Sequence, residues 1–147
     1  MRRIGITGGI GSGKSVVSRL LRIMGYSVYD TDSEAKRLME SSLEVVQKLS
    51  ECFGRDIYHN GRLNRGLLSS RVFGESDKIV LLNSIVHPVV RFDFYRWSES
   101  LNEEICFVES AILYESRFDE LVDEVWTVTA PEELRIGRVR QRSGLTE

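Results

Sequence analysis

Short apolar runs alternate with longer helical patterns along this chain, which predicts an α/β fold. Four runs are typical of strands: residues 4–7, 26–29, 105–108 and 124–129. The third run is apolar without a break, as expected for a strand buried on both faces. Between the first two runs, apolar residues recur at helical spacing from Val16 to Met24, and Gly25 offers a helix end. These segments predict a β-α-β unit whose strands form a parallel pair.

From residue 33 to about 104 the pattern is helical throughout, with no convincing strand. Gly54 and Gly74 are expected to end helices, Asn64 to cap one, and Pro88 to stand in the first turn of a new one. A crossover between parallel strands needs far fewer residues, so the excess predicts an inserted substrate-binding subdomain. Its aromatic residues either line a pocket or belong to the core: Phe92, Phe94, Tyr95 and Trp97.

Composition restricts the class of protein without changing this picture. The 147 residues suit a single domain, and the formal net charge of -2, with no basic run, argues against a nucleic-acid partner. No apolar run approaches the length of a membrane span. Cys52 and Cys106 lack metal-site spacing and are expected to be free thiols in a reducing compartment. We expect a cytoplasmic monomer.

The first strand leads into Gly8-Gly9-Ile10-Gly11-Ser12-Gly13-Lys14-Ser15, which matches G-x-x-x-x-G-K-[ST] at every fixed position. Glycines allow backbone N–H groups to converge on phosphate oxygens, and the following helix adds its positive N-terminal end. Lys14 is expected to reach the terminal phosphates and Ser15 to bind Mg²⁺. The alternative is a glycine-rich turn that binds nothing. The motif residues predicted to hold a nucleotide are Gly8, Gly11, Ser12, Gly13, Lys14 and Ser15.

Acidic residues follow two of the predicted strands. Asp30 and Asp32 come after the second strand and Glu109 ends the third, so all three are expected at the carboxyl edge, where ligands bind in open α/β sheets. We assign Asp32 as the base that accepts the proton of an attacking hydroxyl. Asp30 is assigned to a metal or positioning role, and Glu109 to Mg²⁺ through water or to substrate. Asp30 or Asp32 can instead simply cap the next helix.

Pro131 is expected to open a final helix that carries Arg135, Arg138 and Arg142 on one face. Such a stripe is either a solvated surface or a lid that closes over transferring phosphate. His87 precedes a proline; we assign it no proton-transfer role and place it among the substrate-contacting candidates with Asp30 and Glu109.

Together these stretches resemble the dephospho-coenzyme A kinase family over nearly the whole chain. The resemblance rests on the phosphate loop, the Asp30-x-Asp32 pair, Leu63-Asn64-Arg65, Val72-Phe73, Ile85-x-His87-Pro88, Glu109 to Glu115 and Arg138-x-x-x-Arg142. It implies ATP-dependent phosphorylation of the ribose 3′-hydroxyl of dephospho-CoA, with Mg²⁺. It also implies ATP binding by Gly11 to Val16, Asp32 as the base, and a catalytic lid arginine at Arg138.

The implied fold is a P-loop NTPase-type parallel sheet sandwiched by helices. Its nucleotide-binding core would be residues 1–32 and 105–130, its helical CoA-binding insert residues 33–104, and its partial lid residues 131–147. Family members run on past Glu147, so the resemblance implies a truncated chain. The sequence departs from the family at four further positions, with Val16 for Thr, Asn64 for Asp, Glu109 for Asp and Arg135 for Gln.

Two other functions remain open at this point. One is a different small-molecule kinase of the same architecture, such as a shikimate or gluconate kinase, which also carries an Asp-x-Asp pair after the second strand. The long helical insert and Ile85-x-His87-Pro88 favour dephospho-CoA over those acceptors. The other is a nucleotide-binding chain without turnover. A GTPase is disfavoured, because neither N-K-x-D nor D-x-x-G occurs.

Overall fold

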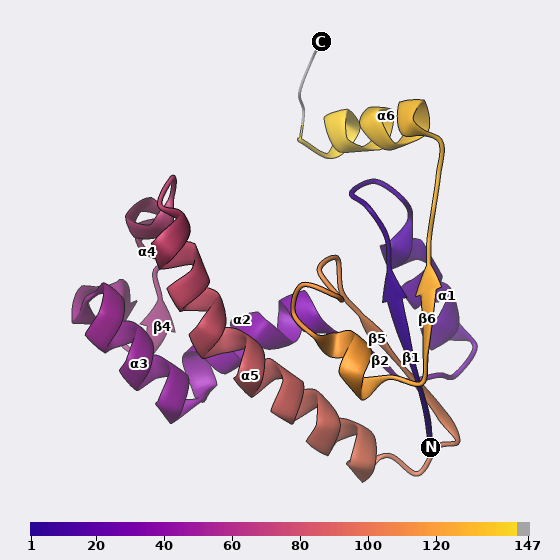
Figure 1. Cartoon of the computed structure of the whole chain (residues 1–147), viewed down its shortest axis with the longest axis horizontal. Coiled ribbons are helices and arrows are strands. Elements are labelled where there is room, and N and C mark those ends of the chain that lie inside the picture. The colour runs from indigo at the N-terminus through magenta and orange to yellow at the C-terminus, as the bar shows by residue number, and fades with distance from the viewer. Residues whose placement is uncertain (144–147) are drawn as a thin grey trace. The chain divides into compact units, whose positions relative to one another are not determined.

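A four-stranded parallel sheet forms the centre of the first of two structural units (Figure 1). The computed structural model describes residues 1–143. Unit 1 comprises Met1–Thr31 and the described residues from Phe94 onward, and unit 2 comprises Asp32–Asp93. The strands of the sheet, in spatial order, are β2 (Val28–Asp30), β5 (Ile105–Glu109), β1 (Arg2–Thr7) and β6 (Glu124–Thr127).

The prediction that β1 and β2 form a pair is wrong in one respect. Both run parallel, but β5 lies between them: Ile6 is in register with Glu109 of β5, and Tyr29 of β2 with Val108. The central place of β5 has a physical reason, because its four residues from Cys106 onward are all buried. A strand that is apolar on both faces is most stable when neighbours cover both of its edges and both of its faces.

Helical segments of unit 1 cover both faces of this sheet. On one face α1 (Lys14–Ile23) packs Leu21 against Ile4, Ile6 and Phe107. On the other face the C-terminal turns of α5 (Ser76–Ser100) bury Phe94 completely. The Phe94 ring contacts Tyr29 of β2 and Phe118, with centroid distances of 5.3 and 5.7 Å. Phe118 begins the 3₁₀ turn η2 (Phe118–Leu121). The predicted sheet with helices on both faces is therefore confirmed.

Unit 2 is mainly helical, as expected. Its helices are α2 (Thr31–Ser41, which begins at the last residue of unit 1), α3 (Leu43–Phe53), α4 (Arg65–Val72) and the first part of α5. Asn64 caps α4 as predicted, because its side-chain oxygen accepts a hydrogen bond from the Leu67 N–H at 3.0 Å. Helix caps of this kind can be predicted from the sequence because the two residues that bond are only three positions apart.

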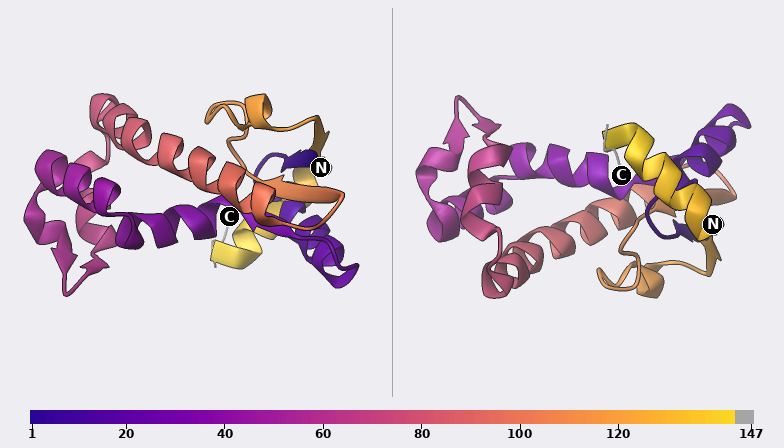
Figure 2. Two further views of the ribbon diagram at one scale, coloured as in Figure 1. Left: turned by 90° about the horizontal axis from the view of Figure 1, so that it is seen from below. Right: turned by 90° about the horizontal axis from the view of Figure 1, so that it is seen from above.

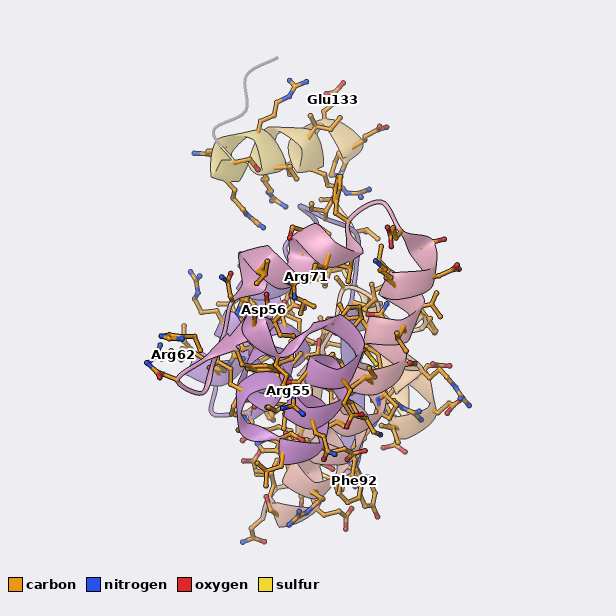
Figure 3. The ribbon with its side chains drawn as sticks, turned by 90° about the vertical axis from the view of Figure 1, so that its left-hand side faces the viewer. Arg55, Asp56, Arg62, Arg71, Phe92 and Glu133 are labelled. Atoms are coloured by element: carbon orange, nitrogen blue, oxygen red, sulfur yellow. The ribbon has the colours of Figure 1, made fainter. Side chains whose placement is uncertain are left out.

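An ion pair joins α4 to the 3₁₀ turn η1 (Arg55–Ile57) within unit 2 (Figure 3). Arg71 donates to both carboxylate oxygens of Asp56, at 2.7 and 2.6 Å, and to the Phe53 carbonyl at 2.5 Å. The hydrogen bonds from Arg71 hold the pKa of the Asp56 carboxyl below its usual value. Because both charges meet solvent, this pair orients the turn more than it stabilises the fold.

Two features of unit 2 differ from the prediction. A hairpin, β3 (Tyr58–His59) with β4 (Arg62–Leu63), interrupts the expected run of helices. Asn60 and Gly61 form its turn with φ angles of 51° and 78°. Positive φ at both central residues is the backbone that an Asn-Gly dipeptide favours in two-residue hairpins.

Pro88 does not start a helix; it lies inside α5, which continues through it as one rod (Figure 2). An internal proline costs about 3 kcal/mol through its missing N–H and its steric clash. Pro88 itself is exposed, but Ile85, Val86 and Val90 near it in the sequence are buried, and their burial helps to offset this cost.

The last described element is α6 (Glu132–Ser143), which has no buried residues. The final four residues of the predicted lid lie outside the part of the chain that the structure describes. Among the helices that are described, none is long and apolar enough to cross a membrane.

Candidate active site

The phosphate loop connects β1 to α1 within unit 1. The Ser12 N–H donates to the Gly9 carbonyl at 3.1 Å, and α1 begins directly after Gly13. Gly13 offers no side-chain cap, and the first turn of α1 carries no acidic residue. The start of α1 therefore has no side chain that caps it or neutralises its positive field, which suits it to binding an anion.

Two glycines of the loop are required by close approaches of other backbone. A Cβ on Gly8 would lie 2.4 Å from the Val128 carbonyl oxygen. Gly11 has φ of 73°, and a Cβ there would lie 2.6 Å from the backbone oxygen of Arg135 on α6. The loop is thus enclosed by the segment after β6 and by the first turns of α6, and only glycine fits at these two points.

Lys14 lies over the loop. Its Nζ donates to the Gly8 carbonyl at 3.0 Å and to the Gly9 carbonyl at 3.4 Å. This is the cation predicted to reach the terminal phosphates, and it is held by the same segment that would surround them.

Ser12 provides a test of whether the loop fits a ligand. Its side chain is buried, with 5 % exposure, and its Oγ makes no hydrogen bond to any residue that the structure describes. A buried hydroxyl without a partner is costly, so a donor at this position suits a ligand oxygen.

Glu109 ends β5 beside the first turns of α1. Its Oε2 accepts a hydrogen bond of 2.7 Å from Ser18 Oγ, and its Oε1 lies 3.4 Å from Ser15 Oγ. Ser15 is the predicted Mg²⁺ ligand, so the structure brings it together with Glu109, as the sheet edge implied. Ser18 was missed by the sequence reasoning. The sequence did hold a signal for Ser18: it is a polar residue next to the apolar positions Val17 and Leu21, on the face of α1 that packs against the sheet.

Asp30 and Glu109 are register partners on adjacent parallel strands. Thr31 follows Asp30 and donates its hydroxyl to the Glu109 backbone oxygen at 2.8 Å, which fixes the start of α2 to the end of β5. Asp32 comes next, in the first turn of α2, and is the first residue of unit 2. Unit 1 thus contains Asp30 and Glu109 together at one edge of the sheet. Asp32 is two residues after Asp30 in the chain and belongs to unit 2.

Two arginines of α6 contact the backbone of the phosphate loop. Arg135 Nε donates to the Ile10 carbonyl at 3.1 Å, and Arg138 donates to the Gly11 carbonyl at 2.9 Å. Their spacing of three residues, noted in the sequence, places both on the side of α6 that faces the loop.

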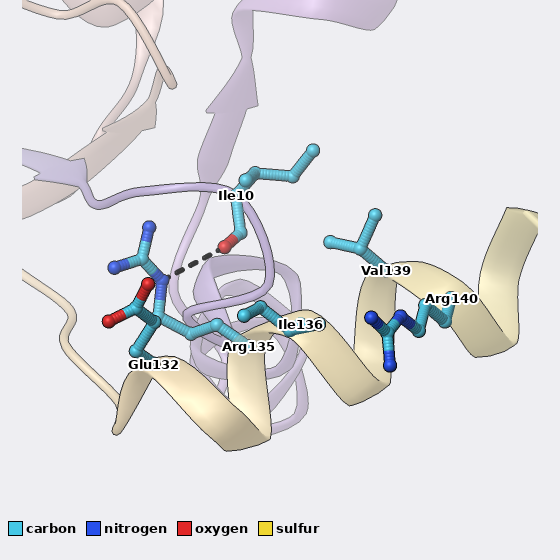
Figure 4. A pocket seen from close by; sticks show the side chains of 6 residues that line it. All are labelled: Ile10, Glu132, Arg135, Ile136, Val139 and Arg140. Atoms are coloured by element: carbon cyan, nitrogen blue, oxygen red, sulfur yellow. Dashed lines mark hydrogen bonds between the residues drawn. The ribbon is translucent and has the colours of Figure 1, made fainter. Parts of the chain in front are cut away.

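A pocket of about 440 Å³ lies between the tip of the loop and α6 (Figure 4). Its apolar lining comes from Ile10, Ile136 and Val139, and charged groups complete it: Glu132, Arg135 and Arg140. Figure 4 shows the bond from Arg135 to the Ile10 carbonyl at one end of this pocket.

His87 lies in unit 2, half-buried within α5. Burial lowers the pKa of His87, so its neutral form is favoured at pH 7. His87 remains a candidate substrate contact, as the sequence suggested.

Within residues 1–143 no three His, Cys, Asp or Glu side chains gather as a metal cluster. A site that offers one hydroxyl and one carboxylate suits Mg²⁺, which keeps several waters and binds substrate phosphates rather than an all-protein cage. Ser15 and Glu109 supply such a pair of oxygen donors.

The family model and the curated relatives point to the same family. The family model described as dephospho-CoA kinase matches residues 2–147. A dephospho-CoA kinase from Porphyromonas gingivalis is 47% identical over 144 residues, which make up 98% of this chain and 71% of that protein.

Two solved structures extend this result. The crystal structure of TT1252 from Thermus thermophilus has a TM-score of 0.83 and 37% identity, covering 99% of this chain and 74% of that one. A dephospho-CoA kinase from Campylobacter jejuni, with a TM-score of 0.71 and 24% identity over 99% of this chain and 75% of that one, shares the fold. The chain described here belongs to the dephospho-CoA kinase family.

Proposed function

We propose that this chain transfers the γ-phosphoryl group of ATP to the ribose 3′-hydroxyl of dephospho-CoA, giving coenzyme A and ADP. ATP-dependent phosphorylation of dephospho-CoA is the reaction of its family. The residue assignments rest on the phosphate loop. The helix that follows it has no side-chain cap, Lys14 bonds to its Gly8 carbonyl, and the buried Ser12 hydroxyl has no hydrogen-bond partner among the described residues.

The phosphate chain of ATP binds the N–H groups of the loop and of the first turn of α1. Lys14 exchanges the Gly8 and Gly9 carbonyls for phosphate oxygens, so its charge moves onto the group being transferred. Ser15 and Glu109 hold Mg²⁺ directly or through water, and the ion when bound neutralises charge on the β- and γ-phosphates. Arg138, in the lid, stabilises charge that develops during transfer.

Asp32 accepts the proton of the ribose 3′-hydroxyl as the new P–O bond forms and the bond to ADP breaks. Asp30 and His87 are assigned to substrate contact and positioning. The acceptor part of the site is assigned to the helical insert, residues 33–104, and the lid to residues 131–147.

The test is a turnover assay of ADP release with ATP, Mg²⁺ and three alternative acceptors: dephospho-CoA, shikimate and gluconate. Turnover with dephospho-CoA alone, and a product phosphorylated at the 3′ position by ³¹P NMR, are expected. Preference for shikimate or gluconate would refute the proposed acceptor. Tight ATP binding without turnover on any acceptor would instead indicate a nucleotide-binding chain.

Lys14→Ala is the matching variant, with Arg2→Ala as its control. Arg2 is an exposed cation paired with Glu124 at the start of β1, so its removal tests loss of a positive charge at the end of β1 opposite the loop. We expect Lys14→Ala to abolish phosphoryl transfer while the far-UV circular dichroism spectrum is kept. Full activity of Lys14→Ala would exclude the loop as the donor site.

A further inference from the structure

The carboxylate of Glu109 has two oxygens in different surroundings. Glu109 is 8 % exposed, so the residue as a whole is largely removed from water. Oε2 accepts a bond of 2.7 Å from Ser18, within the range of a strong charge-assisted hydrogen bond. Oε1 lies 3.4 Å from the Ser15 hydroxyl, at the outer limit of hydrogen bonding.

Ser18 is placed for this contact by the geometry of α1. It follows Ser15 by three residues, so the two hydroxyls share one side of the helix. Its side chain is completely buried, and the bond to Glu109 is the one that fills its donor. The backbone of Glu109 is held independently, since its carbonyl accepts from Thr31 at 2.8 Å.

From these contacts we propose that Ser18 is a positioning residue for the divalent metal. It binds Oε2 and thereby fixes the side-chain torsions of Glu109, which keeps Oε1 directed at the place where Ser15 offers its hydroxyl. A glutamate has three rotatable side-chain bonds, so without this anchor its carboxylate samples other rotamers. Ser18 thus acts on the metal through Glu109. The inference rests on the proposed function, because it concerns the metal of that nucleotide site.

A purely structural role for Ser18 is the competing explanation. In that case the hydroxyl only satisfies a buried carboxylate, and its loss lowers stability without a specific effect on metal affinity. Ser98 offers a matched control in unit 1. It is also completely buried, accepts from Arg3 at 2.8 Å and donates to the Tyr95 carbonyl at 2.8 Å.

The experiment measures Mn²⁺ binding by electron paramagnetic resonance in the presence of ADP, so that turnover is not needed. Ser18→Ala is expected to weaken Mn²⁺ binding by about tenfold, the loss typical when a partner that orients a metal ligand is removed. Binding of ADP in EDTA should stay within about twofold of wild type, since Ser18 lies outside the phosphate loop and its hydroxyl is bonded to Glu109. Ser98→Ala should lower the melting temperature and leave Mn²⁺ binding unchanged.

Two further variants test whether Ser18 acts on the metal through its hydrogen bond to Glu109. Ser18→Cys keeps the shape with a weaker donor, so it should show an intermediate loss and provides the test if Ser18→Ala does not fold. In a Glu109→Gln background, Ser18→Ala should cause little additional loss of Mn²⁺ affinity, because both changes act on one group.

Equal Mn²⁺ affinity of wild type, Ser18→Ala and Ser18→Cys would overturn the inference and leave the nucleotide site standing. Additive losses in the double variant would also overturn it, since Ser18 would then not act through Glu109. Failure of the wild type to bind Mn²⁺ with ADP would overturn both the inference and the proposed function.

Discussion

Replacing Gly11 with alanine tests how closely α6 is seated on the phosphate loop. Gly11 has φ of 73°, and the added Cβ would lie 2.6 Å from the Arg135 backbone oxygen and 3.0 Å from its Cα. Ordinary contact starts at 3.4 Å, so the gap to that oxygen must open by about 0.8 Å. A backbone cannot swing aside as a side chain does, so α6 itself has to move.

The cost in stability can be bounded. Holding alanine in the left-handed region costs about 1–2 kcal/mol. The steric clash adds little to the free energy of unfolding, because α6 has no buried residues and can detach from the loop. For a chain of this size we expect a fall in melting temperature of about 2–8 °C. Arg138 should lose its bond to the Gly11 carbonyl at the same time.

Gly9→Ala is the matched comparison. A Cβ on Gly9 would lie 2.3 Å from a terminal nitrogen of the Arg135 side chain, which can move away at small cost. Arg135→Ala should therefore remove the effect of Gly9→Ala. It should leave the effect of Gly11→Ala in place, because there the obstacle is the backbone of residue 135.

The assays are thermal unfolding and limited digestion with trypsin, with cleavage after Arg138 quantified by mass spectrometry. A detached α6 should be cut faster in Gly11→Ala than in wild type or Gly9→Ala. If Gly11→Ala is cleaved at the wild-type rate, the close contact between Gly11 and the backbone of Arg135 is refuted. The same holds if Arg135→Ala fully restores the stability and cleavage rate of Gly11→Ala.

Three other outcomes are expected. Asp32→Asn should lower kcat by about 10²–10⁴ if Asp32 is the base, and an effect confined to KM would point to positioning instead. Burial lowers the pKa of His87, so the unfolded chain binds its proton more readily and the free energy of unfolding should fall as pH drops below about 6.5. In urea titrations from pH 7 to 5, His87→Gln should flatten that fall, and an unchanged slope would contradict the assignment. Burial also raises the pKa of the Cys106 thiol, whereas Cys52 is exposed. A thiol reagent at pH 8 should therefore label Cys52 in the native protein much faster than Cys106. Labelling of both cysteines at the same rate would contradict the burial of Cys106.

Features set by neighbouring residues were readable from the sequence. The loop stands between a strand and a helix where the glycine motif predicted it, and Asn64 caps α4 through a bond only three residues long. The hairpin at Asn60-Gly61 had the same kind of local signal, which the strong helical pattern around it obscured. These elements are specified by backbone chemistry within a few positions.

Features set by distant packing were not readable in the same way. The insertion of β5 between β1 and β2 depends on pairing across more than seventy residues of chain, which no local pattern reports. Pro88 is tolerated inside α5 because residues of the same helix, Ile85, Val86 and Val90, are buried by the fold. Ser18 looked like an ordinary helix residue until the fold placed Glu109 against it.

Four carbonyl oxygens of the phosphate loop are bonded to cationic side chains. Those of Gly8, Gly9, Ile10 and Gly11 all accept hydrogen bonds from the cations of Lys14, Arg135 and Arg138. A glycine-rich segment ordinarily loses much conformational entropy when it closes on a ligand. Here three positive charges hold the loop before any nucleotide binds, and the bonds from Arg135 and Arg138 remain when Lys14 turns to the phosphates. ATP therefore binds a loop that is already largely ordered and whose peptide groups are already polarised.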